Sequence, residues 1–525
     1  MSSANGRQDL SALGVQDLSA LGIQALVDPG KTPTDEQVRV IEAPRRPLLV
    51  VAGAGSGKTE TMSMRVLWLV ANHEDIAPSS VLGLTFTRKA AGELGDRLRQ
   101  RLTLLAGRVP SLRERLDEDP VSLTYNSFAE RIVAEHGMRI GIDPDFTMLT
   151  EAGAVDLMTQ IVEGWPTDLD EDLSPSAAVG HCLHLAGEVG EHGYTVEEAR
   201  DALEGFGRDL EQIGATNDTA RKTLRANARR LAYLGPVEEF QRRKREGGLL
   251  DFSDQLVLAT RIVRGAPAVR AQVRDEFQAV LLDEFQDTSV IQMELLSLLF
   301  HDHAVTAVGD PNQAIYGWRG ASASSLERFL DRFQDGPAQP GQTLTLSTAW
   351  RNDRNILRAA NRVAAPLREH SRAAKSPVLR ARPGAGEGRV DVAYTQDYRS
   401  ALGAVVDFVS AHRARGTQEG KRPTTAVLCR RRSDFPYVDM ALREAGVPTQ
   451  IVGLGGLLDQ PSVQDARAAL VLADDVEASP WLARLLAGID LGAADLVALG
   501  DWARHLAREE GRDPHRAVLL DAVDN

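Results

Sequence analysis

The sequence AGAGSGKT at residues 52–59 follows the apolar run PLLVVAG and precedes a helical pattern. Its glycines permit a tight turn whose backbone N–H groups form a nest for the β- and γ-phosphates of a nucleotide, and the dipole of the following helix strengthens that nest. Lys58 is predicted to neutralise phosphate charge, and Thr59 to offer its hydroxyl to Mg²⁺. Ala52 stands where the strict pattern has glycine, and alanine still leaves room for the turn. The residues predicted to surround the phosphates are Ala52, Gly53, Ala54, Gly55, Ser56, Gly57, Lys58 and Thr59.

A second apolar run ends in paired acids, in the string LLDEFQDT at residues 281–288. Ligands of α/β proteins bind at the carboxyl ends of the strands, which is where Asp283 and Glu284 are expected to lie. Asp283 is predicted to hold Mg²⁺ and Glu284 to orient and deprotonate the attacking water. An exposed acidic loop is the alternative, and the P-loop disfavours it. The two strings together predict an ATP-hydrolysing motor.

A third string, VGDPNQAIYGWRGA at residues 308–321, runs from an apolar strand into polar and aromatic residues. Gln313 is placed to sense the γ-phosphate. Tyr316, Trp318 and Arg319 combine aromatic faces with a cation, as a platform for single-stranded nucleic acid requires. For Tyr316 and Trp318, packing into the core is the alternative.

Composition limits the class of protein. The chain has 525 residues, of which 43% are hydrophobic and 26% charged, and no apolar run approaches the length of a membrane span. A net charge of −14 argues against indiscriminate polyanion binding, so a nucleic-acid site must be a local groove. Two distant cysteines favour a reducing compartment. These features predict a cytoplasmic protein with no membrane partner.

The order and spacing of several strings resemble the UvrD/Rep/PcrA branch of superfamily 1A DNA helicases over about residues 33–474. The strings that carry the resemblance are AGAGSGKT, LTFTRKAA, TYNSFA, DFSDQL, LLDEFQDT, VGDPNQAIYGWRGA and LSTAWRN. The resemblance implies that Gln37 reads adenine, that Trp350 stacks on it, and that Arg351 reaches the γ-phosphate from a second motor domain. With Lys58, Glu284 and Gln313, Arg351 then completes the catalytic set. Closure of a cleft between two motor domains would couple hydrolysis to motion.

The resemblance also implies a DNA-binding surface. Phe86 and Thr87 match DNA contacts of the second strand's loop, and Tyr125, Asn126 and Ser127 match a further contact. Asn126 stands where the family more often has histidine. With ATP and Mg²⁺, the implied activity is 3′ to 5′ movement along single-stranded DNA and unwinding at single/double-strand junctions, in DNA repair or recombination.

The sequence predicts an α/β fold in which a RecA-like parallel sheet carries a helical insertion and a partial second RecA-like domain follows. The stretch QDGPAQPGQ at residues 334–342 is the expected domain boundary, and VDVAYT and TTAVLCR are expected strands of the second domain. The expected divisions are a flexible extension at 1–30, a first motor domain at 31–140 and 249–342, a helical insertion at 141–248, the start of a second motor domain at 343–475, and the start of a second helical insertion at 476–525.

Two motifs of the family, one bearing threonine and glutamate and one a final arginine, do not occur before Asn525. The chain is therefore expected to be the amino-terminal part of a longer protein. The segments GLGGLLDQPSVQDARAAL and WLARLLAG look more like the motor of an AdnB-type helicase–nuclease, which implies a downstream nuclease and a partner subunit. The alternatives from other classes are a non-hydrolysing P-loop DNA clamp, an RNA-directed helicase and a small-molecule ATPase. The intact Lys58, Glu284 and Arg351 disfavour the clamp.

Overall fold

The structure is a computed structural model, and it describes part of the chain. The described residues are 18–143, 146–167, 169, 174–214, 217–317, 324–334, 341–370, 375–418, 424–452, 461–476, 478–489, 491–512 and 517–524. They form two compact units, Met1–Val390 and Asp391–Asn525. The predicted nucleotide residues and the described nucleic-acid residues lie in the first unit.

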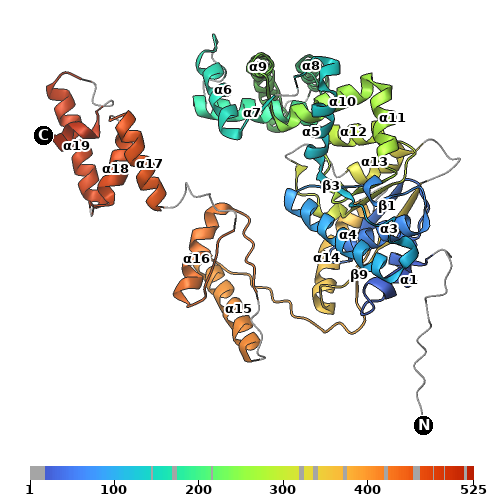
Figure 1. The fold of residues 1–525 in the computed structure, drawn as a ribbon. Coiled ribbons are helices and arrows are strands. Elements are labelled where there is room, and N and C mark those ends of the chain that lie inside the picture. The colour runs from blue at the N-terminus through green and yellow to red at the C-terminus, as the bar shows by residue number, and fades with distance from the viewer. Residues whose placement is uncertain are drawn as a thin grey trace. The chain divides into compact units, whose positions relative to one another are not determined.

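The first unit is built on a parallel sheet of six strands in the order β3-β2-β6-β7-β1-β8 (Figure 1). Strand β1 lies between β7 and β8, so the P-loop leaves the sheet beside the strand that precedes Gln313. The predicted α/β fold with a parallel sheet is confirmed. The strands are β1 Leu48–Ala52, β2 Val81–Thr85, β3 Val121–Thr124, β6 Ala279–Leu282, β7 Val305–Gly309 and β8 Gln342–Leu346.

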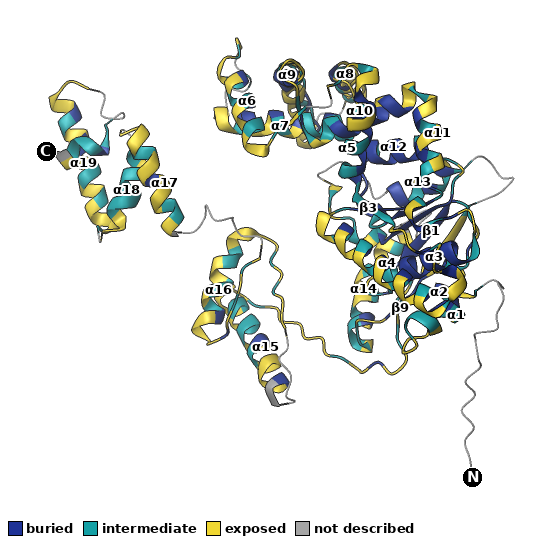
Figure 2. Cartoon of the chain, in the orientation of Figure 1, coloured by how far each residue is buried: buried dark blue, intermediate teal, exposed yellow. Residues whose placement is uncertain are grey.

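Helices cover both faces of this sheet because successive strand side chains point to opposite faces. Leu49 and Val51 belong to one core, whereas Leu48 and Val50 belong to the other. Figure 2 shows the buried residues concentrated in the strands and in the helices packed on them. Helices α1 Ala20–Val27, α2 Asp35–Ile41, α3 Lys58–Asn72 and α4 Arg88–Arg108 cover one face, and α5 Tyr125–His136, α10 Phe252–Gly265, α11 Pro267–Glu276, α12 Val290–Phe300 and α13 Ser324–Phe333 cover the other.

Helix α1 corrects part of the flexible extension expected at residues 1–30, and residues 1–17 of that extension lie outside the described residues. Ser19 caps the helix by accepting the Gly22 N–H, and Ala20 and Ile23 are fully buried in the core beneath α3. The Leu18 N–H also donates to Asn72 Oδ1 over 2.6 Å. The sequence reading missed this because only docking onto α3 makes so short a helix stable.

The helical insertion is confirmed, and it has a core of its own. Its chain enters through β4 Thr147–Met148 and leaves through β5 Leu249–Leu250, which pair in parallel as a two-residue ladder. Figure 1 shows the insertion beyond α5, α10 and α12. The helices are α6 Glu151–Glu163, α7 Pro175–Glu191, α8 Val196–Gln212 and α9 Asp218–Glu246.

The structure differs from the expected boundary at 342/343. Strand β8 pairs with β1 and therefore belongs to the first sheet. The compact unit continues through β9 Thr348–Ala349, α14 Arg354–His370 and β10 Arg380–Ala381, and ends at Val390. A Gly- and Pro-rich stretch marks a turn, but it does not show with which strand the next segment pairs.

The strands expected at VDVAYT and TTAVLCR are not formed, because the described residues of both segments are irregular. Val392 and Tyr394 are 91% and 103% exposed, so the first segment has no neighbouring strand on which to build a ladder.

The second unit has a small apolar core of Val409, Leu442 and Val447. None of the described helices is both long and apolar enough to cross a membrane. The second unit's helices are α15 Tyr398–Gln418, α16 Phe435–Glu444, α17 Pro461–Asp474, α18 Ser479–Ala487, α19 Ala493–Glu509 and α20 Leu519–Asp524.

Candidate functional site

The P-loop connects β1 to α3 through two glycines in the left-handed conformation. Gly55 has φ +74° and Gly57 has φ +81°. A Cβ on Gly55 would lie 3.0 Å from Arg351 Cβ, and one on Gly57 would lie 3.0 Å from Gln37 Nε2. The left-handed conformation therefore favours glycine at both positions, and the close approaches show that Gln37 and Arg351 lie beside the turn.

The residues of the turn fit a bound phosphate. Ser56 is 2% exposed, and its Oγ has no hydrogen-bond partner within the described part of the chain. A buried hydroxyl without a partner is costly unless a ligand satisfies it. Lys58 and Thr59 lie in the first turn of α3, where free N–H groups attract anions.

Lys58 and the acidic pair meet at the carboxyl end of β6. Lys58 Nζ lies 2.7 Å from Glu284 Oε2, and Gln286 Nε2 donates to the same oxygen over 2.9 Å. Glu284 has φ +49°, an unusual conformation for a residue with a side chain, of the kind found at functional sites. Burial, with the neighbouring Glu284 carboxylate, raises the pKa of Asp283 to about 6. Such a buried carboxylate is a suitable partner for a divalent cation, whose charge would lower that pKa again.

Gln313 connects to the same acids through Gln286. Gln313 Nε2 donates to Asp310 Oδ2 over 2.7 Å, and the Asp310 N–H donates to Gln286 Oε1 over 3.0 Å. Gln286 thus links the strand end that carries Glu284 to the strand end that carries Gln313. Gln286 is not among the site residues predicted from the sequence, although its place inside LLDEFQDT, beside Glu284, could have indicated a role in the site.

A cavity of about 660 Å³ opens beside the P-loop and has Gln37, Thr61 and Trp350 in its wall. Gln37 Oε1 accepts the Thr34 N–H, and its Nε2 donates to Thr61 Oγ1 over 3.2 Å. The backbone N–H of Trp350 donates to Gly55 O over 2.8 Å, and Trp350 is 39% exposed. The cavity places an amide and an indole at one end of the phosphate turn, as a nucleotide base requires.

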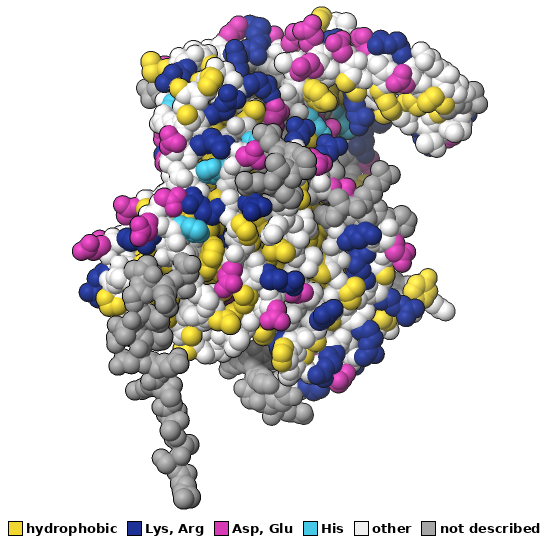
Figure 3. All heavy atoms as spheres, turned by 90° about the vertical axis from the view of Figure 1, so that its right-hand side faces the viewer, with side chains coloured by type: hydrophobic (Ala, Val, Ile, Leu, Met, Phe, Trp, Pro, Cys, Tyr) yellow, Lys and Arg dark blue, Asp and Glu magenta, His cyan; other side chains and the backbone are white. Residues whose placement is uncertain are grey.

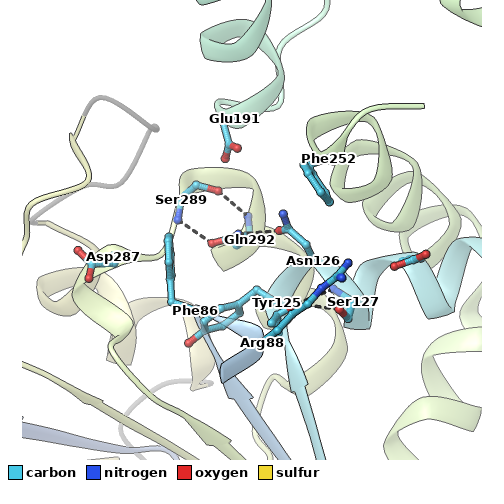
Figure 4. A pocket seen from close by; sticks show the side chains of 12 residues that line it. Phe86, Arg88, Tyr125, Asn126, Ser127, Glu191, Phe252, Asp287, Ser289 and Gln292 are labelled. Carbon is cyan, nitrogen blue, oxygen red and sulfur yellow. Dashed lines mark hydrogen bonds between the residues drawn. The ribbon is translucent and has the colours of Figure 1, made fainter. Parts of the chain in front are cut away.

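The described residues predicted to contact DNA lie near a second cavity, of about 230 Å³, shown in Figure 4. Phe86 is stacked on Tyr316 with ring centroids 4.9 Å apart. Asn126 Oδ1 accepts a hydrogen bond from Gln292 Nε2 over 3.3 Å. The cavity is lined by Phe86, Arg88, Thr124, Tyr125, Asn126, Ser127, Glu130, Glu191, Phe252, Asp287, Ser289 and Gln292.

Of Thr87, Trp318 and Arg319, which are also predicted to contact DNA, the structure describes only Thr87. Thr87 does not line the cavity, and its hydroxyl caps α4 by accepting the Ala90 N–H. Trp318 and Arg319 lie outside the described residues, so their roles stay predictions.

The cavity adds Arg88 and Phe252 to the predicted set. Phe252 is 54% exposed directly after Asp251, the capping residue of α10. An aromatic residue at the predicted start of a helix was the sequence signal that could have identified Phe252.

Figure 3 shows basic and acidic side chains interspersed on the face it draws. This distribution agrees with the prediction that nucleic acid binds in a local groove.

Comparison with known proteins identifies one matching family and several similar proteins. The family described as the UvrD/REP helicase N-terminal domain matches residues 33–334. DNA helicase II of Haemophilus influenzae is 26% identical over 492 residues, which are 94% of this chain and 60% of that protein. DNA helicase II of Escherichia coli is 28% identical over 440 residues, 83% and 54% of the two chains. The ATP-dependent DNA helicase UvrD2 of Mycobacterium tuberculosis is 28% identical over 513 residues, 94% and 64% of the two. The chain thus spans less than two thirds of each of these relatives.

Proposed function

We propose, from the premise that this chain belongs to the UvrD/Rep helicase family, that it is the motor region of an ATP-dependent DNA helicase. The observation that carries the proposal is the segment from Asp283 to Gln292. Its first residues meet Lys58 at the P-loop, and its last residues line the cavity of Phe86 and Tyr125. One short segment therefore belongs to both the nucleotide site and the nucleic-acid site.

The residues divide the work of hydrolysis. Lys58 leaves Glu284 when the γ-phosphate of ATP enters, because the phosphate offers the ammonium group a stronger partner. Glu284 is then free to orient and deprotonate water, and Gln313 senses the γ-phosphate. Arg351 stabilises the negative charge that develops on the γ-phosphate during hydrolysis. Thr59 and Asp283 would hold Mg²⁺, which when bound neutralises phosphate charge.

The finer proposals rest on the resemblance to the family. We propose movement in the 3′ to 5′ direction on single-stranded DNA, action at single/double-strand junctions, and a role in DNA repair or recombination. We propose a first motor domain of residues 31–140 and 249–342, interrupted by the insertion at 141–248. Strand β8 is added to this domain because it pairs with β1, and the second motor domain is proposed to follow it. An AdnB-type helicase–nuclease with a partner subunit is the alternative assembly.

The test uses the complete protein that contains this chain. ATP turnover is measured without nucleic acid and with single-stranded DNA or RNA, and unwinding is measured on duplexes with a 3′ or a 5′ tail. We expect DNA-stimulated turnover and unwinding of the 3′-tailed duplex. Nucleotide binding without turnover would support the DNA clamp. Stimulation of turnover by RNA alone would support an RNA helicase, and turnover that no nucleic acid changes would support a small-molecule ATPase.

A further inference from the structure

Tyr125 reaches from the nucleic-acid cavity into the hydrolytic site. It is the first residue of α5, lines the cavity shown in Figure 4, and is 3% exposed. Its hydroxyl donates a hydrogen bond to the backbone oxygen of Asp283 over 2.9 Å. A phenol is protonated at neutral pH, so the Tyr125 hydroxyl acts as the donor in this hydrogen bond.

The oxygen that Tyr125 holds belongs to the peptide group between Asp283 and Glu284. The other side of this turn is fixed by the Asp283 N–H, which donates to Leu84 O over 2.9 Å. Glu284 follows the peptide in the left-handed conformation, with φ +49°. This peptide group contains the backbone nitrogen of Glu284, and φ of Glu284 is the rotation about the bond from that nitrogen to Cα. A rotation of the peptide group would therefore redirect the Glu284 carboxylate.

The aromatic ring of Tyr125 faces the proposed DNA path. Its edge meets Phe86, with ring centroids 6.5 Å apart and an interplanar angle of 64°. Phe86 is itself stacked on Tyr316. A base that enters the cavity and stacks on Phe86 must compete with Tyr316, so the ring beside Tyr125 changes its environment when DNA binds.

We propose that Tyr125 is a positioning residue that transmits nucleic-acid binding to the Asp283–Glu284 peptide and so adjusts the hydrolytic base. The proposal rests on the proposed function. A phenylalanine would fill the same space in the cavity and keep the contact with Phe86, so packing alone does not require the hydroxyl. The hydroxyl donates a direct hydrogen bond from a side chain of the cavity wall to the backbone of the acidic pair.

The experiment is Tyr125→Phe in the complete protein. We expect the ratio of ATP turnover at saturating oligo-dT to turnover without DNA to fall at least about threefold, as loss of one net hydrogen bond allows. The dissociation constant for oligo-dT, measured by fluorescence anisotropy, should change less than about twofold because the ring remains. The matched control is Tyr233→Phe, since Tyr233 is 4% exposed in the separate core of the insertion.

A second variant tests the other end of the path without touching the hydroxyl. Phe86→Leu should lower the same ratio at saturating oligo-dT. The inference is overturned if Tyr125→Phe leaves the ratio unchanged, or if turnover falls by the same factor with and without DNA, which would mean that the hydroxyl only holds the site together. A wild-type protein that DNA does not stimulate would instead count against the proposed function.

Discussion

The proposed nucleotide site and the cavity proposed to bind nucleic acid are built from different interactions. In the proposed nucleotide site, several polar groups already have partners, such as Lys58 with Glu284 and Gln37 with Thr61. The walls of the nucleic-acid cavity include aromatic rings, and Phe252 there is 54% exposed. Fixed hydrogen bonds discriminate strongly between chemical groups, whereas stacking tolerates any base. Changes in the first site should therefore alter ATP turnover by orders of magnitude, whereas changes in the second should cause smaller losses of affinity for single-stranded DNA.

The largest effect is expected from Lys58→Ala, which should reduce ATP turnover below detection. The variant removes the phosphate charge and leaves the Glu284 carboxylate without its partner at 2.7 Å. The control is Lys222→Ala, because Lys222 is 79% exposed on α9. Undiminished DNA-stimulated turnover in Lys58→Ala would refute the assignment of the P-loop.

Glu284→Gln should lower turnover by at least about 10²-fold, the effect of losing a positioned base. ATP binding, measured by calorimetry, should stay normal or tighten because the amide no longer holds Lys58 as an ion pair. Asp283 remains in place in this variant. If ATP binding is lost together with turnover, the division of labour between Asp283 and Glu284 is wrong.

The nucleic-acid cavity predicts a smaller, graded loss. Phe86→Ala should weaken binding of single-stranded DNA by about 1–3 kcal/mol, the contribution of one stacked base. Phe252→Ala is the matched comparison, because its ring lines the same cavity from α10. Equal DNA affinity in wild type and Phe86→Ala would place Phe86 among purely structural residues.

The sequence predicted the parts of the site that lie at strand ends. Asp283 and Glu284 could be placed because they directly follow an apolar strand, and Lys58 because it ends the glycine turn after another. The carboxyl ends of parallel strands share one edge of the sheet. The contacts between distant segments could not be placed. Glu36 and Ser347 are separated by 311 positions, and their contact depends on the register of β8 against β1.

The fold was predicted with the same strengths and weaknesses. Strands β1, β2, β6 and β7 were expected because buried parallel strands are continuous apolar runs. The membership of β8 in the first sheet and the docking of α1 were missed, since both depend on tertiary pairing. The expected strand at 390–395 failed for the related reason that apolar alternation does not supply a neighbouring strand.

The smallest effect is expected at Glu36, which ties the base cavity to the segment that leads to Trp350 and Arg351. Glu36 Oε2 accepts the Ser347 N–H and its Oε1 accepts the Ser347 hydroxyl, each over 2.7 Å. Glu36 precedes Gln37 on α2, and Ser347 lies three residues before Trp350, so this pair joins the two segments that carry the amide and the indole of the cavity wall. Glu36→Ala should therefore raise the KM for ATP about fivefold, a loss of about 1 kcal/mol, with a smaller change in kcat.

Ser347→Ala is the matched variant, because it removes the hydroxyl and keeps the backbone N–H that Glu36 also binds. It should raise the KM for ATP by less than Glu36→Ala does. The double variant should be no worse than Glu36→Ala alone, because the hydroxyl contributes only through Glu36. Fully additive effects on KM would show that the two residues act separately, and the nucleotide site would then be less tightly connected than its hydrogen bonds indicate.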